Sequence, residues 1–302
     1  MPYFIRNGKI QTEGIQFAAA HHCNLRCADC VALSPYASPR FPSTDSTAAD
    51  LGCLGTVLHA QEVRMLGGEP LLNPELGQLA SVARKSGIAD AVTMFSNGLL
   101  LGRMEEAVWQ NLDLLNLSLY PEAPPPAAVL DRALAQAQQH GTRVRLFRRH
   151  QFHTRVVSTP HDLDFTARLI YRTCRPAHYD HCHWVSAGWL YKCAMPLFLP
   201  GYLAKLGREG YETALDGVQL HEGPGLFEDV KGYLLSKEPL DCCRYCLGSM
   251  GIRQPHRQLS KGEVENPALT TRATHLSRTR MALHLASHAR HMVVSRLRGG
   301  LD

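Results

Sequence analysis

Three cysteines, Cys23, Cys27 and Cys30, lie within the stretch HHCNLRCADC, directly after a short apolar run. Cysteine thiolates are ligands for zinc and for iron–sulfur clusters. The spacing CxxxCxxC supplies three ligands, whereas a structural zinc site normally uses four. Either another part of the chain supplies a fourth ligand, or an external group completes the site.

A second group of cysteines lies further along the chain. Cys174 and Cys193 flank a glycine, and Cys243 and Cys246 form a CxxC pair. Four thiolates suit a structural zinc ion as well as a fully ligated iron–sulfur cluster, so these residue types leave both kinds of site open.

The chain has 302 residues, of which 45% are hydrophobic, enough for one large α/β domain or a barrel with a small appended domain. Its start has no secretory pattern, and no apolar stretch reaches the roughly 18 residues that span a membrane. We therefore expect a cytoplasmic protein without a membrane partner, whose ten cysteines favour metal sites over disulfides. The net charge of +5 is modest, so nucleic acid is not an expected partner.

Short apolar runs alternate with helical patterns from residue 14 to about residue 150, which predicts a parallel sheet. Cys53, on the first predicted helix, is expected to be a small core residue. The predicted strands are residues 14–20, 60–66, 90–95, 112–120 and 142–147, and the predicted helices are residues 46–58, 73–87, 103–111 and 127–141.

The pattern loosens after about residue 150. Residues 162–174 are predicted to form a helix and residues 183–193 a short hairpin, and a loop-rich stretch then leads to the CxxC pair. The tail from Thr270 to Arg298 is predicted to be a solvated helix with many basic residues, with contact to a partner or an anionic substrate as the alternative.

Polar and glycine residues follow the predicted strands at their carboxyl ends, where α/β sheets and barrels build their sites. Gly67 and Gly68 end the second strand and allow close backbone approach, and Glu69 offers an acceptor for an ammonium group. Asn97 follows the third strand and Ser118 ends the fourth, where both side chains could donate hydrogen bonds to a ribose.

In this order the motifs resemble the radical S-adenosylmethionine (radical SAM) superfamily over about residues 14–150. The resemblance implies an α/β fold with a partial (β/α)6 TIM-like barrel. Cys23, Cys27 and Cys30 would bind three irons of a 4Fe–4S cluster, and S-adenosylmethionine would chelate the fourth iron. The family usually has an aromatic residue before the third cysteine, but this chain has Asp29, so adenine stacking is not expected there.

The same resemblance assigns roles to the residues at the strand ends. Gly67, Gly68 and Glu69 would hold the amino end of the methionine. Asn97 and Ser118 would contact the ribose and the carboxylate of S-adenosylmethionine.

Residues 170–250 resemble the auxiliary-cluster extension called the twitch or SPASM domain. Too few cysteines remain for the longer SPASM form, so the twitch form with one fully ligated cluster fits better. Cys174, Cys193, Cys243 and Cys246 would be its ligands, giving two 4Fe–4S clusters in all, with structural zinc as the alternative. The chain then divides into a radical SAM core at residues 1–165, a small C-terminal auxiliary-cluster domain at residues 166–255 and a helical basic tail at residues 256–302.

The resemblance implies an enzyme that takes a hydrogen atom from a polar small molecule, such as a sugar or an aminocyclitol in antibiotic biosynthesis. The product would be oxidised or epimerised, and the reducing partner would be a flavodoxin or ferredoxin. Cys182 and Cys242 are alternative cluster ligands and candidate hydrogen-atom donors, because a thiol has a weak S–H bond. Substrate contacts are expected from the end of the fifth strand, which offers Arg145, Arg148, Arg149, His150 and His153.

Two rival functions are considered. A radical SAM maturase of a ribosomally made peptide commonly has an N-terminal recognition domain, for which the position of Cys23 is expected to leave no room. A redox-sensing iron–sulfur or zinc protein, binding nucleic acid through the basic tail, would have no use for the glycine turn at the second strand end.

Overall fold

The computed structural model describes residues 3–161, 164–270, 285–286 and 289. Its strands are β1 (Phe4–Arg6), β2 (Lys9–Ala20), β3 (Leu58–Gly67), β4 (Ala89–Ser96), β5 (Leu114–Leu119), β6 (Arg143–Arg148), β7 (Gln151–His153), β8 (His183–Ser186), β9 (Trp189–Tyr191), β10 (Gly217–Gln219) and β11 (Arg253–Pro255). Its α-helices are α1 (Thr44–Gly55), α2 (Leu76–Lys85), α3 (Glu106–Gln110), α4 (Ala127–His140), α5 (Asp164–Arg172), α6 (Arg175–His178), α7 (Met195–Lys205), α8 (Leu226–Leu235) and α9 (Lys261–Glu265).

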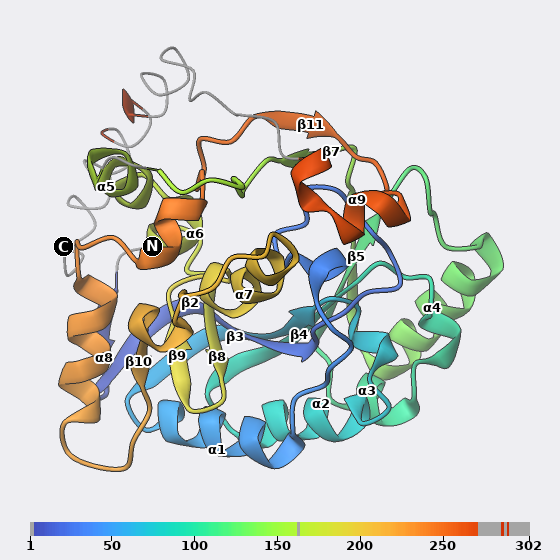
Figure 1. Cartoon of the computed structure of the whole chain (residues 1–302). Helices are drawn as coiled ribbons and strands as arrows, with labels where there is room; N and C mark the ends of the chain where they lie inside the picture. The colour runs from blue at the N-terminus through green and yellow to red at the C-terminus, as the bar shows by residue number, and fades with distance from the viewer. Residues whose placement is uncertain (1–2, 162–163, 271–284, 287–288, 290–302) are drawn as a thin grey trace.

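One large sheet organises the described part of the chain (Figure 1). Its strand order is β10-β9-β8-β2-β3-β4-β5-β6, with β1 paired to β2. The run from β8 through β2 to β6 is parallel, and β9 and β10 continue it antiparallel. The fold is therefore α/β with a mostly parallel sheet, as in a partial TIM-like barrel, and the predicted strand–helix repetition is confirmed.

Two hairpins frame this sheet. The predicted hairpin of residues 183–193 is confirmed as β8 and β9. The other hairpin, β1 with β2, was not expected, and β2 begins at Lys9 rather than at residue 14. Asn7 and Gly8 form its turn with φ values of 51° and 73°, and an Asn-Gly pair is the residue pair that such a turn favours.

The expectation of a loop-rich stretch before the CxxC pair is wrong, because α7, β10 and α8 lie there. The sequence of α7 contains two prolines. Pro196 lies in the first turn, where a helix tolerates proline, whereas Pro200 lies inside. Leu199 and Tyr202 are almost fully buried, so packing outweighs the unfavourable propensity of Pro200.

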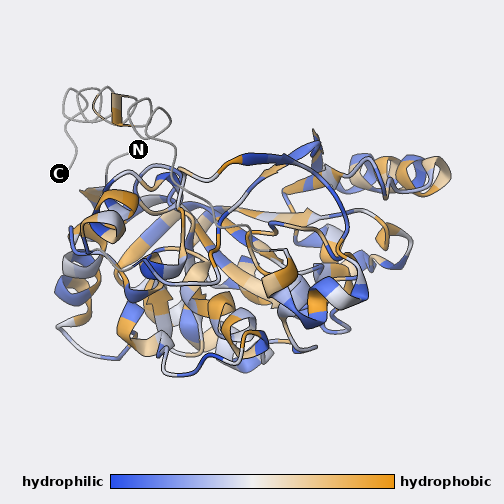
Figure 2. Ribbon diagram, turned by 45° about the horizontal axis from the view of Figure 1, so that its top comes forward, coloured by the Kyte–Doolittle hydropathy of each residue, from blue (hydrophilic) through white to orange (hydrophobic). Residues whose placement is uncertain are grey.

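The sheet has two different faces. Ile15, Val63 and Met65 belong to the main hydrophobic core, together with apolar residues of α1, α2, α3 and α4. Gln16 and Arg64 alternate with them along the strands and face the opposite side, where they line a cavity. In Figure 2 the central strands are largely hydrophobic, while the helices around them have hydrophobic and hydrophilic sides.

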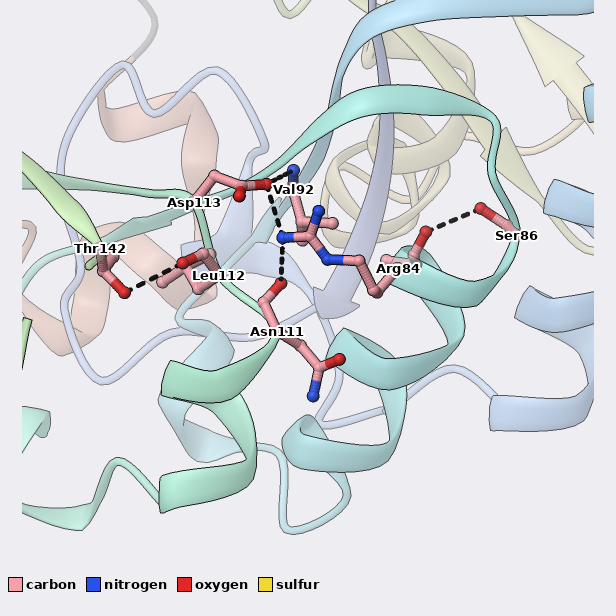
Figure 3. Close-up of polar contacts among 8 residues, drawn as sticks. Arg84, Ser86, Val92, Asn111, Leu112, Asp113 and Thr142 are labelled. Atoms are coloured by element: carbon pink, nitrogen blue, oxygen red, sulfur yellow. Dashed lines mark hydrogen bonds and ion pairs between the residues drawn. The ribbon is translucent and has the colours of Figure 1, made fainter. Parts of the chain in front are cut away.

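A polar network fastens the amino-terminal ends of β4 and β5 to α2 (Figure 3). The Arg84 guanidinium donates to Asp113 Oδ2 over 2.6 Å and to the Asn111 carbonyl over 3.2 Å. The same carboxylate oxygen accepts the Val92 N–H over 2.7 Å. This end of the sheet therefore has a structural role, and the carboxyl ends are left for chemistry.

Other expectations concern regions beyond this sheet. The predicted helix at residues 162–174 is observed as α5 over its described part. The predicted tail helix lies almost entirely outside the described residues. The three-domain division stays a prediction, and β8 from the second predicted domain pairs with β2 from the first. No helix among the described residues is long and apolar enough to cross a membrane.

Asp50 joins α1 to the turn between β8 and β9. Its Oδ1 accepts the Gly188 N–H over 2.8 Å. Ala187 and Gly188 have φ values of 50° and 81°, so the turn depends on unusual backbone conformations that this contact supports. Burial raises the pKa of Asp50 to about 6.

We predict that Asp50→Ala lowers the free energy of unfolding by about 1–3 kcal/mol, because the Gly188 N–H loses its acceptor. Asp50→Asn keeps an acceptor oxygen and should be at least as stable as the wild type at pH 7. Since the folded state binds the Asp50 proton more tightly than the unfolded state, the wild type should lose stability relative to Asp50→Asn as the pH rises from about 4 to about 6. The measurement is urea unfolding of the three metal-free proteins across this pH range. Equal slopes of unfolding free energy against pH for the wild type and Asp50→Asn would contradict the prediction.

Candidate functional site

A cavity of about 460 Å³ lies against the face of the sheet opposite α1, α2, α3 and α4, and it reaches the carboxyl ends of β3, β4 and β5. Both cysteine groups contribute to its walls. The lining residues from the first group and the strand ends are Cys23, Cys27, Cys30, Gly67, Gly68, Glu69, Asn97 and Ser118. Those from the second half of the chain include Cys174, Cys182, Cys193 and Cys246.

The cysteine loop packs directly on the glycine turn that ends β3. The Gly68 N–H donates to the Ala20 carbonyl over 2.7 Å, and the Glu69 N–H donates to the His22 carbonyl over 3.0 Å. A Cβ atom at Gly68 would lie 1.8 Å from the His22 carbonyl oxygen. Gly67 has a φ of 119°, which also favours glycine. The two glycines are therefore required for the approach of the cysteine loop, whatever ligand they also contact.

The first three cysteines are close enough to influence one another electrostatically. Burial is the main cause that raises the pKa of Cys23 to about 12, and Glu69, Cys30 and Cys27 raise it further. Burial likewise raises the pKa of Cys27 to about 12. Thiols in such surroundings stay protonated unless a cation binds, and a metal centre supplies the positive charge that stabilises thiolates. The donor set fits an iron–sulfur cluster with one position left for another ligand.

Glu69 is buried at the centre of the strand ends, with 1% of its surface exposed. Its carboxylate accepts the Ser96 hydroxyl over 2.7 Å, the Asn97 N–H over 2.8 Å and the Leu71 N–H over 3.1 Å. Burial raises its pKa to about 7, partly offset by these hydrogen bonds. Glu69 therefore ties the end of β3 to the end of β4 through three of the roughly four acceptor sites of its carboxylate.

Asn97 contacts the cysteine loop, and Asp29 lies within it. The Asn97 side chain donates to Asn24 Oδ1 over 2.7 Å and lies 3.7 Å from Cys23 Sγ. Asp29 has a φ of 58°, a left-handed conformation that aspartate adopts more readily than most residues.

The second group brings together the four cysteines that the sequence analysis chose. Burial raises the pKa of Cys174 well above its usual value, and the nearby Cys193, Cys246 and Cys243 raise it further. Cys174 precedes α6, Cys193 follows β9, and the CxxC pair lies in and after a 3₁₀ turn at Asp241–Tyr245. The four thiols therefore converge from separate segments.

The two remaining candidate cysteines differ in position. Cys242 has 1% of its surface exposed, and its thiol hydrogen-bonds to Cys193, which lowers the pKa of Cys193. Cys182 lines the cavity, beside Gln16 and Arg64, which lower its pKa against the larger effect of burial. The geometry therefore favours Cys174 over Cys182 as a ligand of the second group, and it leaves Cys182 facing the cavity.

Lys192 beside the second group was missed by the sequence analysis. Its side chain is completely buried, and its ammonium group donates to the Ser236 carbonyl over 2.9 Å and to the Tyr171 hydroxyl. Burial lowers its pKa to about 8, and the nearby Cys243 and Cys193 act against that shift. Lys192 is thus a buried cation placed to balance thiolate charge. Nothing in its sequence context distinguished it from an exposed lysine at a hairpin end.

The basic residues expected near the end of the fifth strand divide into two sets. Arg149 and His153 line the cavity, together with Arg64 and Arg155, which the sequence analysis did not select. Side chains alternate between the two faces of a strand, and Arg64 on β3 lies on the face toward the cavity. This alternation could have identified Arg64 from the sequence. The exposed residues of the expected set are Arg145, Arg148 and His150.

Comparisons with known proteins give partial matches. No known family model matches the chain. GTP 3′,8-cyclase of Chlorobaculum tepidum is 31% identical over 106 residues, which are 35% of this chain and 32% of the cyclase. GTP 3′,8-cyclase of Streptomyces coelicolor is 30% identical over 129 residues, which are 41% of this chain and 38% of the cyclase. The chain thus covers between 32% and 38% of the length of these curated relatives.

Solved structures also resemble the chain at low identity. BtrN in complex with AdoMet and 2-DOIA is 14% identical, with a TM-score of 0.41 over 79% of this chain and 94% of that one. SuiB of Streptococcus suis bound to S-adenosylmethionine is 17% identical, with a TM-score of 0.35 over 46% of this chain and 34% of that one.

Two kinds of metal site are open for the second cysteine group, an iron–sulfur cluster and a zinc ion. Within residues 3–161 and 164–270, no three His, Cys, Asp or Glu side chains are arranged to hold a single metal ion. Counting the iron and the zinc in the purified protein distinguishes an iron–sulfur cluster from a zinc ion at the second cysteine group.

We predict that Gly68→Ala displaces the cysteine loop, because its Cβ has no room beside the His22 carbonyl oxygen. The variant should retain less iron at the first site and lose about 1–3 kcal/mol of unfolding free energy. Gly102→Ala is the matched control, since no atom lies within 4 Å of the added methyl group. Iron analysis and urea unfolding measure both effects, and wild-type values for Gly68→Ala would contradict the predicted contact.

Proposed function

We propose that this chain, a member of the radical SAM superfamily, cleaves S-adenosylmethionine reductively and takes a hydrogen atom from a polar small molecule, with a sugar or an aminocyclitol as the leading substrate class. The observation that supports this most is the single cavity shared by the CxxxCxxC loop, the glycine turn and the second cysteine group. Such a cavity would let a substrate lie between two metal centres.

Cys23, Cys27 and Cys30 would hold the 4Fe–4S cluster that S-adenosylmethionine completes. When bound, this pair supplies a 5′-deoxyadenosyl radical, which abstracts hydrogen from an unactivated C–H bond. The protein's part is to orient both molecules and to exclude water. The glycine turn at Gly67 and Gly68 fixes the cysteine loop beside the cavity for this purpose.

Polar side chains lie on the face of the sheet that borders the cavity, and they could bind the polar groups of a substrate. Gln16 and Arg64 are neighbours in register on β2 and β3, and both line the cavity. Thr93 and Asn116 lie on the same face of β4 and β5 without lining the cavity, and Thr93 Oγ1 and Asn116 Oδ1 are buried without a protein partner. Buried polar atoms of this kind are commonly satisfied by water. A volume of about 460 Å³ is typical of sites for small molecules.

Cys182 is the better of the two candidate hydrogen donors, because it lines the cavity and Cys242 does not. In an epimerisation its S–H bond would break as a new C–H bond forms on the substrate. The sulfur radical would then take one electron and one proton, with a flavodoxin or ferredoxin as the electron source. In an oxidation, the substrate radical would instead lose a proton and pass an electron to the second cysteine group's cluster.

A nucleotide is the second candidate substrate class. The two relatives are named as GTP cyclases, and the cavity contains Arg149 and Arg155, for which no acidic partner exists among the described residues. Guanidinium groups bind phosphate in a bidentate manner. Peptide maturation and redox sensing have no comparable support, and a copurifying peptide or steeply salt-dependent nucleic-acid binding would revive them.

We predict that anaerobic reconstitution gives about eight irons per chain, and that changing Cys23, Cys27 and Cys30 together to Ala leaves about four. Cys53→Ala is the matched control and should retain the wild-type count, since it lies outside both groups. About four irons falling to none, with zinc retained, would mean a structural second site. Oxidation would then lose its electron acceptor, and epimerisation would be favoured.

We predict that a sugar or a cyclitol raises the rate of 5′-deoxyadenosine release, which chromatography measures. GTP, the alternative substrate, is tested in a parallel assay. If the reaction is an epimerisation, wild-type enzyme with the active substrate in D₂O should place deuterium on the product carbon, whereas an oxidation should place none there. Cys182→Ala should still release 5′-deoxyadenosine but lose deuterium incorporation, because the exchangeable S–H is absent. Unchanged incorporation in Cys182→Ala would exclude Cys182 as the donor.

A further inference from the structure

Residues 256–259 cross the cysteine loop from a distant part of the sequence. Cys27 and Gln258 form an antiparallel bridge. The Leu259 N–H donates to the Arg26 carbonyl over 2.7 Å. This segment was expected to belong to a helical tail, but it is extended and pairs with the loop that holds the first cysteines.

Two side chains of this segment place nitrogen atoms beside one sulfur atom. His256 Nε2 lies 3.2 Å from Cys27 Sγ, and Gln258 Nε2 donates to the same atom over 3.3 Å. A thiolate accepts hydrogen bonds and donates none. For the His256 ring to bond a thiolate at Cys27, its Nε2 carries the proton. Gln258 Nε2, which lies 3.3 Å from the same ring nitrogen, then directs its own hydrogen to the sulfur.

The ring of His256 is fixed by its surroundings. It stacks on Tyr120 with ring centroids 4.7 Å apart, and it lies 5.5 Å from Phe152. Its backbone N–H donates to the His150 carbonyl over 2.8 Å. His256 is buried, so its contact with Cys27 is shielded from water.

The amide of Gln258 has a defined orientation. Its Oε1 accepts the Arg26 N–H over 2.6 Å, which directs Nε2 toward the sulfur. Its backbone N–H donates to Glu122 Oε2 over 3.0 Å. Both ends of the side chain are thus committed, and the donor to Cys27 is set in place before any metal binds.

Cys27 has stronger contacts than the other two cysteines of the loop. Cys23 Sγ accepts the Leu25 N–H over 3.4 Å, and Cys30 Sγ lies 3.9 Å from the Ser34 hydroxyl. Cys23 Sγ also lies 3.7 Å from Asn97 Nδ2, so Cys27 differs from Cys23 in having the shorter side-chain contacts, at 3.2 Å and 3.3 Å.

We propose that His256 and Gln258 are positioning residues that hold Cys27 as an iron ligand and raise the reduction potential of the first cluster. The inference rests on the proposed function. An N–H donor withdraws charge from a ligand sulfur and favours the more negative, reduced state. A higher potential makes the one-electron reduction that precedes cleavage of S-adenosylmethionine easier for the external donor.

The test is a redox titration of the reconstituted full chain, followed by electron paramagnetic resonance, with and without S-adenosylmethionine. His256→Phe keeps an aromatic ring on Tyr120 and removes the donor. Gln258→Glu keeps an oxygen for the Arg26 N–H and replaces the donor by an oxygen. Gln254→Glu, the same substitution on β11, is the matched control.

The potential of the signal that responds to S-adenosylmethionine should shift to more negative values in both variants, and further in Gln258→Glu because a carboxylate repels the thiolate. Gln254→Glu should match the wild type. Wild-type potentials in both variants with full iron would overturn the proposal. If His256→Phe loses iron, His256→Gln decides, because its amide restores a donor near the Nε2 position. Regained iron supports the proposal, and continued loss overturns it.

Failure of this inference is distinct from failure of the proposed function. If the wild type holds no iron that depends on Cys23, Cys27 and Cys30, the proposed function fails. If the wild type holds that iron and its paramagnetic signal responds to S-adenosylmethionine, the proposed function stands. If the His256 and Gln258 variants then have the wild-type reduction potential, only the role of these two residues fails.

Discussion

The site depends on one close approach between two backbones. The loop that carries the first cysteines lies on the turn after β3, where the Gly68 N–H meets the Ala20 carbonyl and the Glu69 N–H meets the His22 carbonyl. No side chain fits between them. Because Glu69 also binds the end of β4, the same turn connects the cysteine loop to the next strand and fixes its position relative to the cavity.

The contacts that stabilise the sheet lie on one face and at the amino-terminal ends of its strands, away from the face that borders the cavity. Its apolar face packs on the helices, and the Arg84–Asp113 network holds the amino-terminal ends of the strands. Its other face carries buried polar residues such as Thr93 and Asn116, whose burial costs free energy that the apolar core offsets. Polar residues at the carboxyl ends become tolerable because the stable contacts lie elsewhere.

How much of this was predictable depends on whether the signal was local. Strand–helix repetition, the glycine turn and the cysteine spacing are properties of short stretches, and they predicted the parallel sheet and the residues around the cavity. The roles of Lys192 and His256 depend on partners far away in the sequence, and no local pattern encodes them. Helix α7 was missed for the opposite reason, since Pro200 opposes a helix locally and only tertiary packing stabilises it. The Asn7-Gly8 turn was a local signal that went unused.

The two cysteine groups are also joined through the backbone. Residues 244–256 run alongside residues 150–161, with the Val157 N–H donating to the Tyr245 carbonyl and the Leu247 N–H donating to the Arg155 carbonyl. Paired in this way, one continuous segment leads from Cys246 in the second group to Gln258 on Cys27. Ligands of the second group and donors to the first therefore belong to the same paired segment. The geometry of the first site thus depends on residues more than 200 positions away in the sequence, because they reach it along this segment.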